Sequence, residues 1–404
     1  MKILWVKANK LLPLHSGGDI RSYHIARHLV SRHELCFLSY YDGKSDADYE
    51  RQLAQHLPGA RCVCTGKSQT APARVLDYLM RLADPSPYAV SRFKSALVRR
   101  KLEAWLTVGQ FDVAVCDFLD AAVNFPESPV PSVLFQHNVE SEIWRRHAET
   151  ETNPAKRSVY GMEFRKMLAY EKSSVQRFRH VIAVSEHDKE LMSAWVDSSQ
   201  ITVIPTGVDL RQYRADFSER VIAPLVMFVG AMDWEPNVDA VEFFCNDIWP
   251  TVVAKIPEAR FRIVGRDPVR QVQQFASAAV EVTGRVPSVI DHLREAAVVI
   301  VPLRIGGGTR LKIYEAMAAG KAVVSTSVGA EGLDVHHGRD ILLADDAKGF
   351  GEAVVMLLQD DDLRTRYERA AAELAARYDW ATVGARFEAA LESVASHSAV
   401  MRDL

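Results

Sequence analysis

Short apolar segments alternate with helical patterns along most of the chain, and several of them end in a polar or glycine-containing turn. The segments 3–6, 225–229 and 298–302 are apolar runs of this kind. An apolar run of four or five residues bounded by turn residues is typical of a buried strand in a parallel sheet, which helices cover. The alternation therefore predicts an α/β protein with doubly wound parallel sheets.

The alternation is interrupted at Pro205-Thr206-Gly207-Val208 and then begins again. A chain of 404 residues has room for two or three domains. We predict two Rossmann-like doubly wound domains, residues 1–205 and 206–381, with a helix at about 382–404 that crosses back to the first. In such a protein, a ligand is expected in the crevice between the domains, at the carboxyl ends of the strands.

Composition excludes several classes of protein. The net charge is −3, so the chain has no overall signature of nucleic-acid binding. Its five cysteines show no zinc-site spacing, which favours reduced thiols and a cytoplasmic location. We find neither a signal-peptide pattern at the start nor a run of about 20 apolar residues that would span a membrane.

One stretch is distinctly basic. Residues 92–101 contain Arg92, Lys94, Arg99, Arg100 and Lys101. Such a cluster favours contact with an anionic membrane surface or an anionic acceptor, and equally fits a solvated helix face. It leaves open a peripheral position at the inner face of the plasma membrane.

The segment GGGTRLKIYEAMAAGKAVVST, residues 306–326, carries the strongest functional pattern. Its glycines follow the strand 298–302 and open onto a helix expected at 309–319, so unpaired N–H groups and the positive helix end favour an anion such as a diphosphate. Arg310 and Lys312 add positive charge, and Glu315 can accept hydrogen bonds from a ribose diol. The alternative is a tight turn before a solvated helix.

These residues, and above all EAMAAGKAVVSTSVGAEGL, resemble glycosyltransferase family 4 over most of the chain. The resemblance implies a GT-B fold, in which two Rossmann-like domains face each other across a cleft. It implies retaining transfer of a sugar from a nucleoside-diphosphate sugar, such as a UDP- or GDP-sugar, to a hydroxyl of a glycan or lipid-linked acceptor in surface polysaccharide assembly. It implies no metal and no further cofactor, because amides, the helix dipole and basic residues hold the diphosphate.

The resemblance also assigns donor-binding residues. It implies that Glu315 contacts the ribose and that the backbone of Gly308, Thr309, Arg310 and Leu311 holds the phosphates. Gly307 stands where the family commonly has a glutamate that contacts the donor sugar. The turn Val282–Val286 resembles the one that lines the nucleotide base, with Arg285 and Val286 as the residues whose backbone recognises it.

One loop departs from the family pattern. The family often brings an arginine and a lysine to the diphosphate from the loop at 230–237, and neither is present here. We therefore expect Arg310 and Lys312 to stabilise the leaving phosphate, with help from Arg266, which follows Gly265 at the end of a strand. The Asp-x-Asp pattern of metal-dependent sugar transferases is also missing, since Asp360-Asp361-Asp362 is typical of a helix start.

In the first domain, Gly17 and Gly18 resemble the family's N-terminal glycine loop, which faces the donor phosphates and the acceptor. His137 ends a strand at the position of a histidine that hydrogen-bonds the donor sugar, so we assign it to the catalytic group with Arg310 and Lys312. Two alternatives remain open: a GT-B-type nucleotide-sugar epimerase, and a non-catalytic nucleotide-sugar-binding protein.

Overall fold

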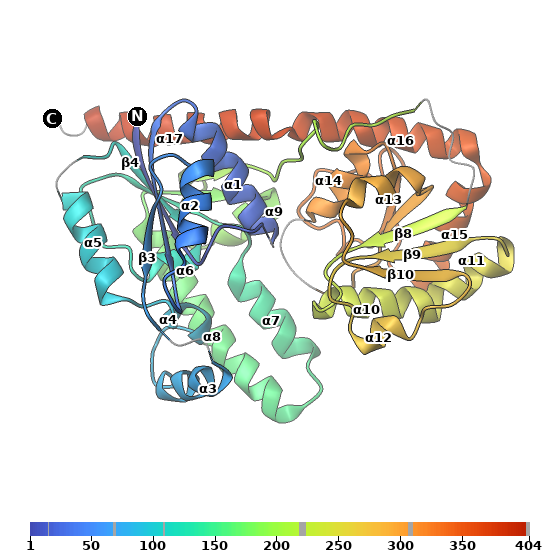
Figure 1. The fold of residues 1–404 in the computed structure, drawn as a ribbon, viewed down its shortest axis with the longest axis horizontal. Helices are drawn as coiled ribbons and strands as arrows, with labels where there is room; N and C mark the ends of the chain where they lie inside the picture. Colours follow the sequence, from blue (N-terminus) through green and yellow to red (C-terminus); the bar gives the residue numbers. More distant parts are fainter. Residues whose placement is uncertain (15, 68–69, 108–109, 218–223, 306–309, 401–404) are drawn as a thin grey trace. The chain divides into compact units, whose positions relative to one another are not determined.

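The computed structural model describes residues 1–14, 16–67, 70–107, 110–217, 224–305 and 310–400 (Figure 1). The chain forms two compact units, one made of Met1–Pro205 with Ala381–Leu404 and one made of Thr206–Trp380. Each unit contains one sheet whose paired strands are all parallel. This confirms the predicted fold class of two parallel-sheet α/β domains.

The sheet of the first unit has the strand order β3-β2-β1-β4-β5-β6-β7, which is the order of a doubly wound dinucleotide-binding sheet. Its strands are β1 (Lys2–Ala8), β2 (Glu34–Tyr41), β3 (Arg61–Cys64), β4 (Val113–Asp117), β5 (Ser132–Phe135), β6 (His180–Ala183) and β7 (Ile201–Val203). The chain order reverses direction at β1, so ligands are expected beyond the carboxyl ends of β1 and β4.

Helices connect the strands of this sheet along the chain. They are α1 (Gly17–Val30), α2 (Ala47–His56), α3 (Ala71–Met80), α4 (Tyr88–Ser91), α5 (Ala96–Thr107), α6 (Leu119–Ala122), α7 (Glu140–Thr150), α8 (Pro154–Arg177) and α9 (Glu186–Met192). The start of α1 corrects one expectation. Gly17 and Gly18 form the first turn of the helix, rather than a loop before it, because Ser16 caps it by accepting a hydrogen bond from the Asp19 amide.

The sheet of the second unit has the order β10-β9-β8-β11-β12-β13. Its strands are β8 (Leu225–Val229), β9 (Arg260–Val264), β10 (Val280–Gly284), β11 (Val298–Val301), β12 (Ala322–Ser325) and β13 (Leu342–Leu343). Its helices are α10 (Glu235–Phe243), α11 (Trp249–Lys255), α12 (Arg270–Gln273), α13 (Val289–Glu295), α14 (Leu311–Ala318), α15 (Ala347–Gln359) and α16 (Asp361–Ala375), and a π-helical turn, Phe244–Ile248, joins α10 to α11. Asp360 caps α16, as its sequence predicts.

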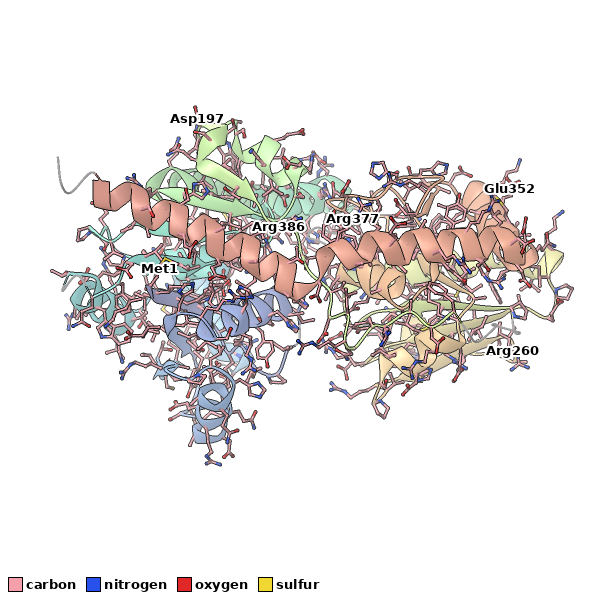
Figure 2. All side chains as sticks on the ribbon, turned by 90° about the horizontal axis from the view of Figure 1, so that it is seen from above. Met1, Asp197, Arg260, Glu352, Arg377 and Arg386 are labelled. Atoms are coloured by element: carbon pink, nitrogen blue, oxygen red, sulfur yellow. The ribbon has the colours of Figure 1, made fainter. Side chains whose placement is uncertain are left out.

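The last helix, α17 (Trp380–Val400), packs on the first unit from Ala381 onward. Phe387 lies against Trp5 of β1 and Phe135 of β5, with ring centroids 5.5 and 4.9 Å away. Figure 2 shows Met1 beside this helix. Among the described residues, no helix is both long and apolar enough to cross a membrane.

Candidate functional site

In the second unit, the predicted anion site lies where β11 leads into α14. Gly307, Gly308 and Thr309 fall outside the described residues, so the glycine run itself is not placed. Arg310 is buried and occupies the N-cap position, and Leu311 begins the helix, two residues later than expected. The helix ends as predicted at Gly320, whose φ of +70° is the left-handed conformation that favours glycine.

The ammonium of Lys312 reaches back to the first turn of α10, just after the loop that follows β8. Its Nζ donates a 2.9 Å hydrogen bond to Asn237 Oδ1 and lies 4.6 Å from the centroid of the Phe228 ring. Burial and the charge of Arg310 lower the pKa of Lys312 to about 7, against the opposing charge of Glu315. The side chain of Lys312 therefore brings an amino group to the segment 230–237, which has no arginine or lysine of its own.

Glu315 lies one turn further along α14 and is half-buried. Burial raises the pKa of its carboxyl, while a hydrogen bond from Tyr213 and the charge of Lys312 lower it. Tyr213 is 9% exposed and is one of the residues that sequence reasoning missed. Its signal was weak, because Tyr213 precedes β8 in the chain and carries no motif.

The loops after β8 and β9 approach each other closely. A Cβ atom on Gly265 would lie 1.6 Å from the carbonyl oxygen of Gly230, so only glycine fits at this place. Arg266 follows, and its guanidinium lies 2.8 Å from Asp267 and 3.5 Å from Asp233. Two carboxylates thus share the charge of Arg266, which weakens its expected contribution at a diphosphate.

The predicted base-recognition turn adjoins the same loops. Gly284 ends β10 with a φ of +69°, and the exposed side chain of Arg285 lies 4.0 Å from Asp267. Val286 packs partly against the hydrophobic core of the unit. Recognition of a nucleotide base by the backbone of Arg285 and Val286 stays a prediction.

In the first unit, His137 lies beyond β5 within a chain of charged contacts. Its Nε2 is 2.8 Å from Asp117 Oδ1, and Asp117 Oδ2 accepts a hydrogen bond from Trp5 Nε1. Lys7 Nζ lies 3.7 Å from Asp117 and 3.3 Å from Asp19. Lys7 and Asp117 are register partners at the ends of neighbouring strands β1 and β4.

These contacts decide the protonation of the group. Burial opposes ionisation of Asp117, but the charge of Lys7 and the hydrogen bond from His137 hold its pKa well below the usual range. Burial lowers the pKa of His137, although Asp117 opposes this, so the imidazole is neutral near pH 7. A neutral ring that donates from Nε2 to Asp117 leaves Nδ1 as an acceptor.

The Nδ1 atom of His137 is buried and has no hydrogen-bond partner among the described residues. Gly18 stands over the ring, since a Cβ atom on it would lie 3.6 Å from His137 Cγ. A buried acceptor beside a bare helix turn suits a ligand hydroxyl. The structure thus brings together two predicted residues, His137 and Gly18, and adds Asp117 and Lys7, which the sequence reasoning missed.

Two acidic side chains lie in the helices that follow β4 and β5, Asp120 in α6 and Glu140 at the start of α7. Burial, with the charge of Asp117, raises the pKa of Asp120 to about 6, and burial, with Asp120 and Glu171, raises that of Glu140 to about 8. Glu171 has a structural part, since its carboxylate accepts from the backbone amides of Glu140 and Ser141 at the start of α7.

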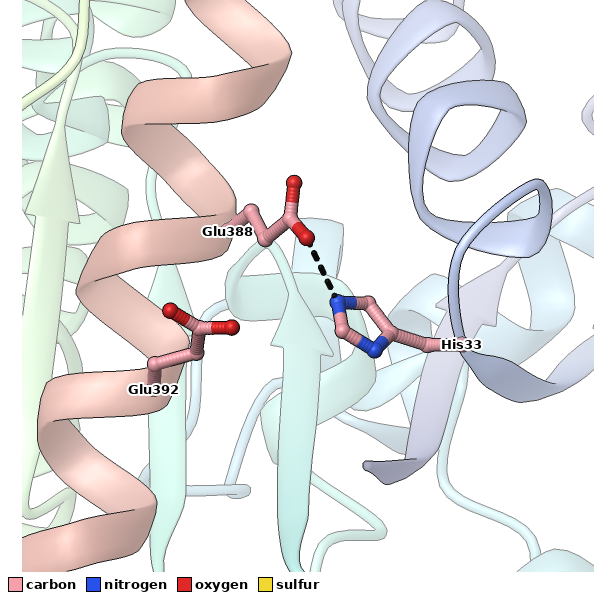
Figure 3. Close-up of side chains that lie close together, drawn as sticks. All are labelled: His33, Glu388 and Glu392. Carbon is pink, nitrogen blue, oxygen red and sulfur yellow. Dashed lines mark hydrogen bonds and ion pairs between the residues drawn. The ribbon is translucent and has the colours of Figure 1, made fainter.

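A separate His–Glu group could hold a metal ion. His33, Glu388 and Glu392 present ligand atoms within 4.8 Å of one another (Figure 3). The contacts also account for the group without a metal, because Glu388 already lies 2.9 Å from His33 Nε2 and 2.8 Å from His28 Nε2. These bonds fasten α17 to the end of α1.

Comparison with known proteins agrees with both units. Residues 16–212 match the model described as Glycosyltransferase Family 4, and residues 223–360 match the one described as Glycosyl transferases group 1. A phosphatidyl-myo-inositol mannosyltransferase of Mycolicibacterium smegmatis is 29% identical over 85% of this chain and 88% of that protein. An uncharacterised protein of the Klebsiella pneumoniae cps region is 26% identical over 55% of this chain and 58% of its own length.

Solved structures share the fold. HepE of Anabaena in complex with UDP aligns with a TM-score of 0.67 and 17% identity, over 97% of this chain and all of that one. A sucrose-phosphate synthase of Thermosynechococcus elongatus aligns with a TM-score of 0.73 and 15% identity, over 98% of this chain and all of that one. Given the two family models and the shared fold, this chain is a glycosyltransferase and belongs to glycosyltransferase family 4.

Proposed function

We propose that the protein transfers a sugar, with retention of anomeric configuration, from a nucleoside-diphosphate sugar to a hydroxyl of a lipid-linked or glycan acceptor. The observation that carries this proposal is the position of Lys312. Its ammonium contacts Asn237, so α14 supplies a cation to the loop in which this chain lacks the family's basic residues. Glu315 lies on the same helix, as a ribose anchor would require.

In the proposed reaction, the bond between the anomeric carbon and the diphosphate oxygen breaks while the acceptor oxygen bonds to that carbon. The proton of the acceptor hydroxyl passes to an oxygen of the leaving phosphate, so no separate base is needed. Arg310 and Lys312, with the backbone of Gly308–Leu311, stabilise the negative charge that grows on the phosphate. His137 positions the sugar through the free acceptor at Nδ1.

Support for the donor comes from the structural relatives. HepE of Anabaena is described in complex with UDP and with UDP-glucose. We propose a UDP- or GDP-sugar donor, no metal or other cofactor, and no nucleic-acid partner. Arg266, Arg285, Val286, Gly17 and Gly18 are proposed as further donor contacts, together with Gly307 and Thr309.

Support for the acceptor comes from the sequence relatives, which are named for transfer to phosphatidyl-myo-inositol. We propose a lipid-linked hydroxyl acceptor at the cytoplasmic face of the membrane, with the protein bound peripherally. Transfer assays with phosphatidylinositol and with membrane lipid extracts, followed by mass spectrometry of the product, test this part.

The donor site is tested by thermal unfolding with UDP, GDP, ADP and dTDP and their sugars, in the presence of EDTA. A nucleotide at 100 times its dissociation constant adds about 2.7 kcal/mol to the stability. Glu315→Ala should lower the affinity roughly tenfold or more, because a hydrogen-bonded charged group is lost. Glu352→Ala, at an exposed glutamate of α15, is the matched control and should keep the full shift. No shift with any nucleotide, or a shift only with added metal, would contradict the proposal.

A nucleotide-sugar epimerase is a second candidate, since Asp120 and Glu140 titrate near neutral pH and could exchange protons with a sugar ring. Turnover of the nucleotide sugar without any acceptor would identify an epimerase. Binding without turnover, across a broad panel of acceptors, would identify a non-catalytic binding protein.

A further inference from the structure

Helix α3 turns its apolar side away from the protein. Of its residues and the turn after it, Val75, Leu76, Leu79, Met80 and Leu82 are 61%, 57%, 55%, 68% and 40% exposed. At 100° per residue, the four helical positions form one continuous face, and Leu82 follows in the turn after it. Soluble proteins rarely expose so many large apolar side chains together, and such patches mark surfaces that bind something.

The opposite side of α3 is polar and holds the helix on the protein. Arg81 binds Asp77 Oδ1 and the carbonyl of Ser91, both at 2.7 Å, and the Tyr78 ring packs against Tyr88 with centroids 5.0 Å apart. Lys166 Nζ of α8 donates a 2.8 Å bond to the carbonyl of Leu82. This attachment fixes the helix with its apolar face, defined here as Val75, Leu76, Leu79, Met80 and Leu82, toward solvent.

Charge around the helix is positive. Residues 70–107 contain seven arginines and lysines against three acidic residues. The charges of Arg81 and Arg92 both act on Tyr88, at the end of the turn that follows α3, and Asp77 is the acid that opposes them there. An apolar face flanked by cations matches an anionic lipid surface, where apolar side chains enter the interface and basic ones meet the headgroups.

The basic cluster at 92–101 is partly neutralised within the protein. Lys94 pairs with Asp84 at 2.7 Å and Arg99 with Glu103 at 2.9 Å. The guanidinium of Arg92 lies 4.5 Å from the Phe93 ring, and the ammonium of Lys101 lies 5.1 Å from the Trp105 ring. The remaining cations supply positive charge but no apolar anchor, and the apolar face of α3 provides that anchor.

We propose that the apolar face of α3 docks this glycosyltransferase on an anionic lipid bilayer. The face carries only aliphatic and methionine side chains, whereas protein interfaces are usually anchored by tryptophan, tyrosine and arginine. The proposal adds a membrane anchor to the proposed transfer to a lipid-linked acceptor, and docking itself requires neither donor nor acceptor.

The test is co-flotation of the full chain with vesicles of phosphatidylcholine alone or of phosphatidylcholine with phosphatidylglycerol. The wild type should bind the anionic vesicles, and less so at high salt. Leu76→Ser with Leu79→Ser should weaken binding roughly tenfold or more. Met356→Ser, at a side chain 44% exposed on α15, is the matched control and should bind as the wild type does. Circular dichroism and the nucleotide-induced thermal shift should be unchanged in both variants.

Three results would overturn the proposal. The wild type could fail to bind anionic vesicles, or the double variant could bind them as well as the wild type. Alternatively, sedimentation velocity could show a dimer that the double variant loses, which would assign the face to a second copy of the chain. A missing nucleotide shift alongside intact vesicle binding would instead count against the proposed donor site alone.

Discussion

The carboxylate of Asp117 lies between His137 and Lys7, with Oδ1 2.8 Å from His137 Nε2 and Oδ2 3.7 Å from Lys7 Nζ. One buried anion thus orients the imidazole and neutralises a lysine at the same strand ends. Asp117 is fully buried and Lys7 is nearly so. Water therefore could not solvate either charge if its partner were removed. The position of His137 therefore depends on a residue that carries no motif.

Asp117→Asn should destabilise the first unit. The change removes the buried charge that faces both Lys7 and His137 and leaves Lys7 only the more exposed Asp19, so we expect the free energy of unfolding to fall by about 3 kcal/mol. Urea denaturation measures this. Asp19→Asn is the control, because Asp19 also contacts Lys7 but is 20% exposed. Equal losses of unfolding free energy in the two variants would show that Asp117 contributes no more to stability than Asp19 does.

The sequence predicted the parts of the fold that depend on local pattern. Strand, glycine and helix signals recur in order, so both sheets and the end of α14 at Gly320 could be predicted. The contacts of Lys7 with Asp117, and of Lys312 with Asn237, join residues 110 and 75 positions apart. Such pairs depend on strand order and helix placement, which no local pattern contains.

The orientation of α3 shows the same limit. Its composition predicts a helix, but an apolar face in a sequence is expected to point inward. Its exposed side chains, and the contacts of Arg81 and Tyr78 with the segment 88–91, show that it points outward in the folded chain. Likewise, no local pattern in the sequence contains the shared contact of Asp233 and Asp267 with Arg266.

Glu388→Gln should loosen the attachment of α17. Burial alone would raise the pKa of this carboxyl, but hydrogen bonds from His28 and His33 hold it below the usual value. That stabilisation is present above pH 4.5, the ordinary glutamate value, and is lost as the pH falls through the lower folded value. Thermal unfolding at neutral pH should show a loss of about 1–2 kcal/mol that shrinks in acid.

Glu392→Gln separates the two readings of this group. Glu392 is exposed. If His33, Glu388 and Glu392 only attach α17 to the end of α1, the change should leave the stability of the protein unaltered. If Zn²⁺ raises the melting temperature of the wild type and Glu392→Gln abolishes that rise, the group is a metal site.

Lys312→Met should stabilise the free protein and weaken donor binding. The folded pKa of Lys312 is about 7, below the unfolded value of 10.5, so the unfolded state binds more protons between these values and stability rises with pH there. Removing the ammonium should therefore add about 1 kcal/mol at pH 7. Calorimetry should show proton uptake when UDP binds the wild type near pH 8 and none in the variant. Proton uptake that persists in Lys312→Met would place the titrating group elsewhere.

Gly17→Ala separates folding from ligand binding at the start of α1. Nothing lies within 4 Å of the position that a Cβ would take, and the residue is already in the first helical turn. Alanine restricts the unfolded chain more than glycine does, so the free energy of unfolding should rise by about 0.5–1 kcal/mol. If the bare backbone admits the donor or acceptor, the more stable variant should nevertheless transfer sugar more slowly. Gly161→Ala, in the middle of α8 and also without close neighbours, is the control, and it should gain stability at no loss of rate. Transfer as fast as the wild type by Gly17→Ala would remove this glycine from the proposed site.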